Sequence, residues 1–174
     1  MGIQFETDYN METLTAMAKG LRKTVRKKRS RRVHIFAAVV LILGLLTILA
    51  TTAGGEPLGA RGVVTLLAML VVILVSLFED RLNAWFARKR LLPGTEHAAA
   101  TFEEDGYVSA TGVTESRFSY AQIVAVAETA RYFVFALSSH HTQAYDKRTI
   151  RGGSVEDFRA FIAEKTGKPI ANIK

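Results

Sequence analysis

Two long apolar runs, joined by a short loop, constrain this chain more than any other feature of its sequence. Residues 33–55 contain no Asp, Glu, Lys or Arg, and residues 62–78 contain no ionisable side chain. Each run is close to the roughly 20 residues that an α-helix needs to cross about 30 Å of hydrocarbon. Because backbone amides in lipid must be satisfied within their own segment, both runs are predicted to be helices. The connecting residues 54–61 leave room for little more than a turn, so we predict a transmembrane helical hairpin.

The charge distribution predicts how this hairpin lies in the membrane. Residues 1–32 hold nine Lys or Arg against three acids, and residues 79–92 hold four against two. The loop between the helices holds one acid, Glu56, and one base, Arg61. Lys and Arg close to the helix ends favour the cytoplasmic side. We therefore expect both termini in the cytoplasm and the loop on the far side, and the absence of cysteine agrees with a reducing compartment.

The basic residues themselves are expected to fix topology and contact anionic lipid. This group comprises Arg22, Lys23, Arg26, Lys27, Lys28, Arg29, Arg31, Arg32, Arg88, Lys89 and Arg90. Nucleic-acid binding is disfavoured because the run directly precedes an apolar span and lacks interleaved aromatic residues. A twin-arginine signal at Arg31 and Arg32 is disfavoured because a second span follows the first.

The segments on either side of the hairpin also carry recognisable patterns. Residues 2–9 alternate with period two and predict a strand, and Asn10 is expected to cap a helix with an apolar stripe from Met11 to Val25. That helix either packs on the protein or bilayer surface or binds a partner. Residues 79–92 are expected to continue as an interfacial helix that Pro93 and Gly94 end. No charged residue lies at mid-membrane, which disfavours a coupled transporter.

From residue 95 onward, short β-like runs alternate with turn residues. Strands are expected at 98–103, 107–111, 113–120, 123–127, 132–137 and 142–145, with 132–137 central and buried. Ser154 is then expected to open an amphipathic helix that Gly167 closes. We predict three parts: a cytoplasmic strand and basic helix (1–32), the hairpin with its extension (33–92), and a cytoplasmic domain (93–174). The fold class is a two-span hairpin plus a small antiparallel β-barrel or sandwich closed by a C-terminal helix.

A family resemblance accompanies this order of segments. Residues 102–108, 118–123 and 145–148, followed by the amphipathic helix, resemble the YcxB-like family of small bacterial membrane proteins. The resemblance implies a pleckstrin-homology-like domain on the cytoplasmic side of the bacterial inner membrane. One position departs from the family pattern, because Asp146 stands where a proline commonly precedes the lysine. The family supplies no activity to carry over.

A search for chemistry finds no catalytic motif. Gly152-Gly153-Ser154 lacks the frame of a nucleophile elbow, and the adjacent His140 and His141 are poorly spaced for chelation, so we predict no cofactor, metal site or enzyme activity. Lys147, Arg148 and Arg151 could contact a partner or a headgroup, or simply form an exposed loop.

These patterns favour a non-enzymatic membrane-anchored protein that presents an interaction domain to a protein or lipid partner. Three alternatives stay open: an oligomeric channel or transport accessory, a hydrolase, and an envelope-stress or immunity component. The partner, the pathway and the formation of a homo-oligomer are left open by the sequence.

Overall fold

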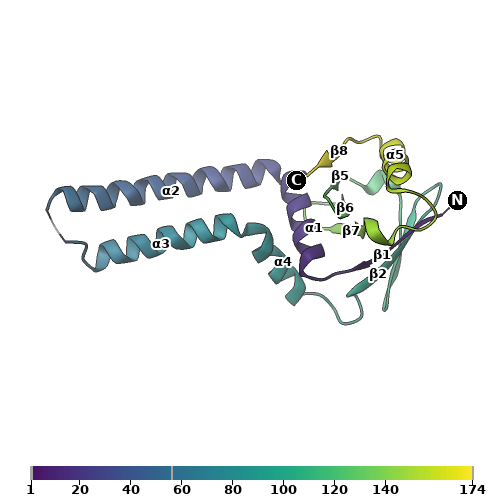
Figure 1. The fold of residues 1–174 in the computed structure, drawn as a ribbon, viewed down its shortest axis with the longest axis horizontal. Coiled ribbons are helices and arrows are strands. Elements are labelled where there is room, and N and C mark those ends of the chain that lie inside the picture. The colour runs from purple at the N-terminus through teal and green to yellow at the C-terminus, as the bar shows by residue number, and fades with distance from the viewer. Residues whose placement is uncertain (1, 56, 174) are drawn as a thin grey trace.

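The computed structural model describes residues 2–55 and 57–173 and consists of a long helical hairpin and a sheet domain at its open end (Figure 1). The elements follow one another as β1 (Ile3–Asp8), α1 (Met11–Lys23), α2 (Lys27–Ala53), α3 (Ala60–Leu77), α4 (Glu79–Lys89), β2 (His97–Phe102), β3 (Tyr107–Thr111), β4 (Glu115–Phe118), η1 (Tyr120–Gln122), β5 (Ala125–Glu128), β6 (Tyr132–Ala136), β7 (Thr142–Asp146), η2 (Lys147–Thr149), α5 (Val155–Thr166) and β8 (Ile170–Asn172).

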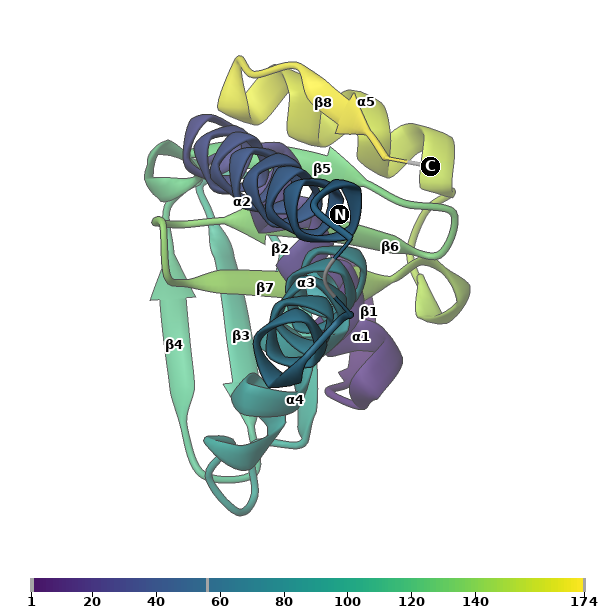
Figure 2. The same ribbon diagram turned by 90° about the vertical axis from the view of Figure 1, so that its left-hand side faces the viewer.

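The hairpin is formed by α2 and α3, which run side by side away from the sheet domain (Figures 1 and 2). Both helices are long and apolar enough to cross a membrane, and none of their most apolar stretch is buried inside the protein. Large apolar side chains such as Leu43 and Leu67 are 58% and 57% exposed. Such a surface matches hydrocarbon rather than water, so the prediction of two candidate spans is confirmed.

The sheet domain contains two four-stranded sheets among the described residues. The first has the order β1-β2-β3-β4 and is antiparallel throughout, and the second has the order β7-β6-β5-β8 with β8 parallel to β5. The sheets meet where the backbone N–H of Asp146 donates to Oγ1 of Thr7 at 3.1 Å. The described strands do not close into one barrel, so only the coarser prediction of packed β-structure with a C-terminal helix is confirmed.

The hairpin is inserted between two neighbouring strands of one sheet. Strands β1 and β2 pair in register from Ile3 opposite Phe102 to Asp8 opposite His97. In the sequence, residues 9–96 therefore connect two strands, β1 and β2, that are hydrogen-bonded to each other. The question whether the N-terminal strand joins the later strands is answered: it is an edge strand of the first sheet.

An aromatic core joins the two sheets and α5. Phe5, Phe102, Phe133, Phe135 and Phe158 are each at most 1% exposed. The ring centroids of Phe5 and Phe158 are 4.6 Å apart, in the edge-to-face arrangement that aromatic pairs prefer. Every residue of β6 is buried, which confirms that this strand is central. The hairpin is thus connected at both ends to a well-packed domain.

Local capping follows the sequence closely. Oδ1 of Asn10 accepts from the backbone N–H groups of Glu12 and Thr13 at 2.9 and 3.0 Å. Ser154 forms a capping box with Asp157, and Gly167 ends α5 at φ +61°. These three caps are confirmed.

Several predicted boundaries differ from the structure, among them the following three. The helix expected to reach residue 92 ends at Lys89, because the N–H groups of Arg90 and Leu91 turn back to carbonyls three residues earlier. The strand expected over 113–120 is limited to Glu115–Phe118, since Ser119 caps η1. The strand expected over 123–127 begins two residues later, at Ala125.

Candidate membrane-proximal site

Helix α1 lies across the open end of the hairpin, between the spans and the sheets (Figure 1). Its buried residues are Thr13, Leu14, Gly20 and Leu21. A Cβ added to Gly20 would lie 2.8 Å from Cγ1 of Val134, so the glycine is what lets α1 approach β6 this closely. Two members of the predicted apolar stripe, Leu14 and Leu21, are thus buried within the protein.

A salt bridge fixes α1 to the first turn of α4, directly after the second candidate span. Nε and Nη2 of Arg22 donate to the two carboxylate oxygens of Asp80 at 2.7 and 2.6 Å. The side chains are only 21% and 15% exposed, and this bidentate geometry is the strongest form of the contact. The hydrogen bond to Asp80 raises the pKa of Arg22 above its usual value. The Arg22 side chain is therefore bound to α4 and is largely shielded from solvent.

The other predicted lipid-contacting residues are placed around the same end of the hairpin. Arg26 is partly exposed, and the exposed members are Lys23, Lys27, Lys28, Arg29, Arg31, Arg32, Arg88, Lys89 and Arg90. Nζ of Lys89 lies 3.6 Å from the ring centroid of Trp85, which is itself 45% exposed. An aromatic and basic pair of this kind is typical of a membrane–water interface.

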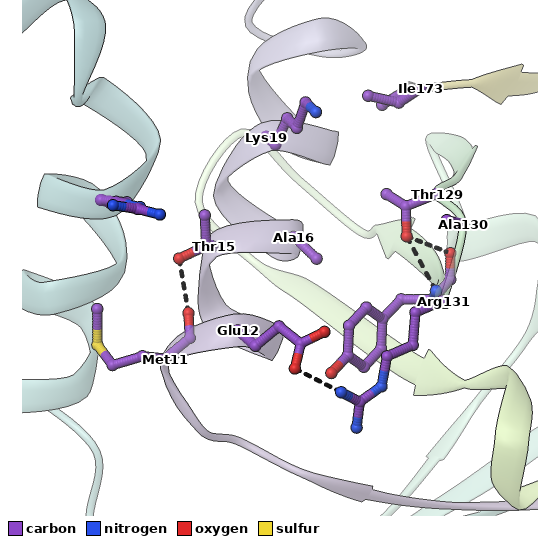
Figure 3. A pocket seen from close by; sticks show the side chains of 11 residues that line it. Met11, Glu12, Thr15, Ala16, Lys19, Thr129, Ala130, Arg131 and Ile173 are labelled. Carbon is purple, nitrogen blue, oxygen red and sulfur yellow. Dashed lines mark hydrogen bonds and ion pairs between the residues drawn. The ribbon is translucent and has the colours of Figure 1, made fainter.

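Two grooves flank the crossing of α1 and α4. The first, here called the Arg131 groove, has a volume of about 570 Å³ and is lined by α1, Arg81 of α4, the β5–β6 turn and Ile173 (Figure 3). Glu12 and Arg131 form an ion pair in it, and Arg131 also binds Asp146 at 2.7 Å. Its lining thus mixes both signs of charge.

The second, here called the Arg26 groove, has a volume of about 470 Å³ and lies between α1, α4 and the β6–β7 loop. Leu14, Leu21 and Phe86 contribute to its apolar lining. The ionisable side chains among its described lining residues are Arg26, Arg90 and His140, with no Asp or Glu among them. Its described ionisable groups are therefore all basic, and they lie beside apolar side chains.

The geometry of Arg26 is set by the β6–β7 loop. Its Nε donates to the carbonyl oxygen of Ser139 at 2.6 Å, and its Nη2 lies 3.0 Å from Nδ1 of His140. Because a guanidinium only donates, Nδ1 must accept here and the ring proton lies on Nε2. Two donor-rich residues that the sequence keeps 64 positions apart, Arg26 and Arg90, thus face one groove together with His140.

The residues predicted as a partner or headgroup contact lie elsewhere. Lys147 is 12% exposed and donates to Oε1 of Glu128 at 2.8 Å, so it belongs to a buried ion pair. Arg148 and Arg151 are 65% and 68% exposed, with Asp146 and Glu6 as their respective partners. Their segment, between β7 and α5, belongs to the sheet domain and lies apart from α2 and α3 (Figure 1).

Sequence reasoning did not single out Asp80, Arg81 or Arg131, and it considered His140 only as a metal ligand. Asp80 and Arg81 directly follow an apolar run, so the sequence already indicated that they lie near the end of the hairpin. Arg131 and His140 are distant in the sequence and join the site only through folding. In residues 2–55 and 57–173, no group of three His, Asp or Glu residues is placed to hold a metal ion.

Comparison with known proteins gives one family match. The family model described as YcxB-like protein matches residues 102–162, from the last residue of β2 into α5. No curated protein and no solved structure matches the chain. The resemblance to the YcxB-like family is therefore confirmed over residues 102–162, the larger part of the sheet domain.

Proposed function

We propose that this chain is a non-enzymatic membrane protein that holds a cytoplasmic interaction domain against the bilayer surface. The observation that carries the proposal is the insertion of the apolar hairpin between β1 and β2. Both outer ends of the hairpin return to one domain, and α1 is bound to α4 through Arg22 and Asp80. Such a connection orients a domain on the membrane, whereas a flexible linker would only tether it.

The proposed orientation places both termini and the sheet domain in the cytoplasm. The basic residues gather at the domain end of the hairpin, and Arg61 alone lies near the loop. Each basic residue near an anionic leaflet contributes about 1 kcal/mol of attraction. For a YcxB-like chain, this corresponds to a multi-pass protein of the bacterial inner membrane.

We further propose that the sheet domain is pleckstrin-homology-like. Four antiparallel strands, then three more in a second sheet, and a C-terminal helix packed on the core support this assignment. Here β8 adds a parallel strand to the second sheet, and the hairpin occupies the β1–β2 connection.

The partner surface is proposed to include Arg148 and Arg151. These side chains are 65% and 68% exposed on the sheet domain, in a segment apart from α2 and α3, where a cytoplasmic protein has access to them. Lys147 is excluded from this surface because it pairs with Glu128.

Photocrosslinking in intact membranes tests this function. A photoreactive residue replaces Arg148, and a matched variant carries it at Arg117, which is 76% exposed on β4. We expect one reproducible protein adduct from position 148 and none from position 117 by mass spectrometry. Adducts to lipid alone, or to a second copy of the chain alone, would refute the adaptor role.

A further inference from the structure

We propose that the Arg26 groove binds one anionic phospholipid of the surrounding leaflet, with its phosphate held between Arg26 and Arg90. This inference rests on the proposed membrane insertion and adds to it a defined site and a ligand class. The polybasic run alone would give only diffuse attraction to the membrane surface.

The charge of the groove selects an anion. Arg26, Arg90 and His140 line it, and no described Asp or Glu does. Hydrogen bonds to Ser139 and His140 occupy Nε and Nη2 of Arg26 and leave Nη1 without a partner in the described chain. The Arg90 side chain likewise has no hydrogen bond or ion pair with a residue in 2–55 or 57–173. Guanidinium groups in this state are ready donors to a phosphodiester.

The rest of the groove selects an amphiphile over a soluble anion. Phe86, which is 52% exposed, and the exposed Ala87 supply an apolar lining beside the basic groups. A free phosphate would leave that lining exposed to water, whereas the glycerol and the first methylenes of a lipid would cover it.

The position of the groove places it within reach of the headgroups. Arg26 directly precedes α2, and Arg90 directly follows α4, which begins two residues after the end of α3. Helix α1 forms one wall and lies across the end of both spans (Figure 1). A lipid bound here would join both spans to the β6–β7 loop of the sheet domain.

Native mass spectrometry of the full-length protein in detergent tests the site. The protein is titrated with phosphatidylglycerol and, separately, with phosphatidylcholine of the same chains. We expect one phosphatidylglycerol to be retained in preference to phosphatidylcholine. R26Q/R90Q should weaken this binding about 100-fold, at roughly tenfold for each charge-assisted hydrogen bond lost. The charge-matched K28Q/R31Q, altered at exposed positions outside the groove, should change it less than twofold.

Each other outcome overturns the site. Equal losses in both double variants would mean diffuse attraction, and equal retention of both lipids would mean no headgroup selection. Competition by inorganic phosphate would assign the groove to a soluble anion. R26Q could disturb the β6–β7 loop, because Arg26 is bonded to that loop. The single variant R90Q avoids this problem, since the Arg90 side chain has no described protein partner, and it tests the site by itself. Membrane insertion is checked separately by carbonate extraction: protein that stays in the membrane yet retains no lipid refutes only the site.

Discussion

At the scale of single residues, Glu128 is a buried charge of the sheet domain that two basic side chains hold in place. It is 4% exposed on β5 and accepts from Nε and Nη2 of Arg159 at 2.9 and 2.8 Å. Nζ of Lys147 donates to the same carboxylate at 2.8 Å. The hydrogen bonds from Arg159 lead the effects that lower the pKa of Glu128 from 4.5 to about 2. This carboxylate joins β5, α5 and the segment after β7.

The depressed pKa makes a prediction about stability and pH. The pKa of Glu128 in the folded protein lies below its value in the unfolded chain, so the ionised carboxylate stabilises the fold. This stabilisation is fully present above pH 4.5, amounts to about 3 kcal/mol, and is lost as the pH falls towards 2. E128Q should therefore lower the thermal midpoint of the full chain in detergent at pH 7, and the gap to the unaltered protein should narrow at pH 3. Near-UV circular dichroism measures both midpoints.

A control separates this effect from a general loss of charge. Glu115 is exposed on the edge strand β4, so E115Q should leave the midpoint nearly unchanged at either pH. A gap between E128Q and the unaltered protein that stays the same at pH 3 would contradict the assignment.

At the scale of elements, α1 is the piece that couples the hairpin to the sheets. It packs on β6 through Gly20 and holds α4 through Arg22 and Asp80. In addition, Oγ1 of Thr13 donates to the carbonyl oxygen of Asp8 at 2.6 Å, which ties its first turn to β1. The helix is thus bound to both sheets and to the spans.

Removing the bond to Asp80 should loosen this coupling without unfolding the domain. D80N replaces a charge-assisted bidentate pair that is largely buried, at a cost of about 2 kcal/mol. We expect faster amide hydrogen exchange in α1 and α4, and unchanged exchange in β5 and β6, when the full chain is measured in lipid nanodiscs. D105N, in the exposed β2–β3 turn, is the matched control. Uniformly faster exchange would show instead that the pair supports the whole domain.

The sequence predicted where helices and strands lie along the chain better than it predicted which of them pair or pack together. Caps at Asn10, Ser154 and Gly167 were predictable because each depends on side chains within a few residues. Strand β8 was not predicted, because its three residues carry no alternating pattern and are stabilised by a parallel partner, β5, more than 40 positions away. The Arg26 groove was likewise hidden, since Arg26, Arg90 and His140 meet only through the crossing of α1 and α4.

At the scale of the whole molecule, the insertion between β1 and β2 determines what the hairpin can do. Because these strands share six register pairs, neither end of the hairpin can move far without breaking the first sheet. The two spans and the domain are consequently expected to move as one body. This arrangement also requires that the hairpin loop and the sheet domain lie on opposite faces of any membrane that the spans cross.

Cysteine labelling in intact cells tests that requirement, and the absence of native cysteine makes the readout unambiguous. Gly59 is suitable in the loop, because its φ is −70° and a Cβ there meets nothing within 4 Å. Ser139 is exposed in the β6–β7 loop and marks the domain side. We expect G59C to react with a membrane-impermeant maleimide in whole cells, and S139C to react only after the cells are opened. Labelling of both in whole cells, or of neither, would refute the hairpin, whereas labelling of S139C alone would reverse its orientation. The reversed result would place the basic residues outside, against the attraction of anionic lipid that the proposed orientation relies on.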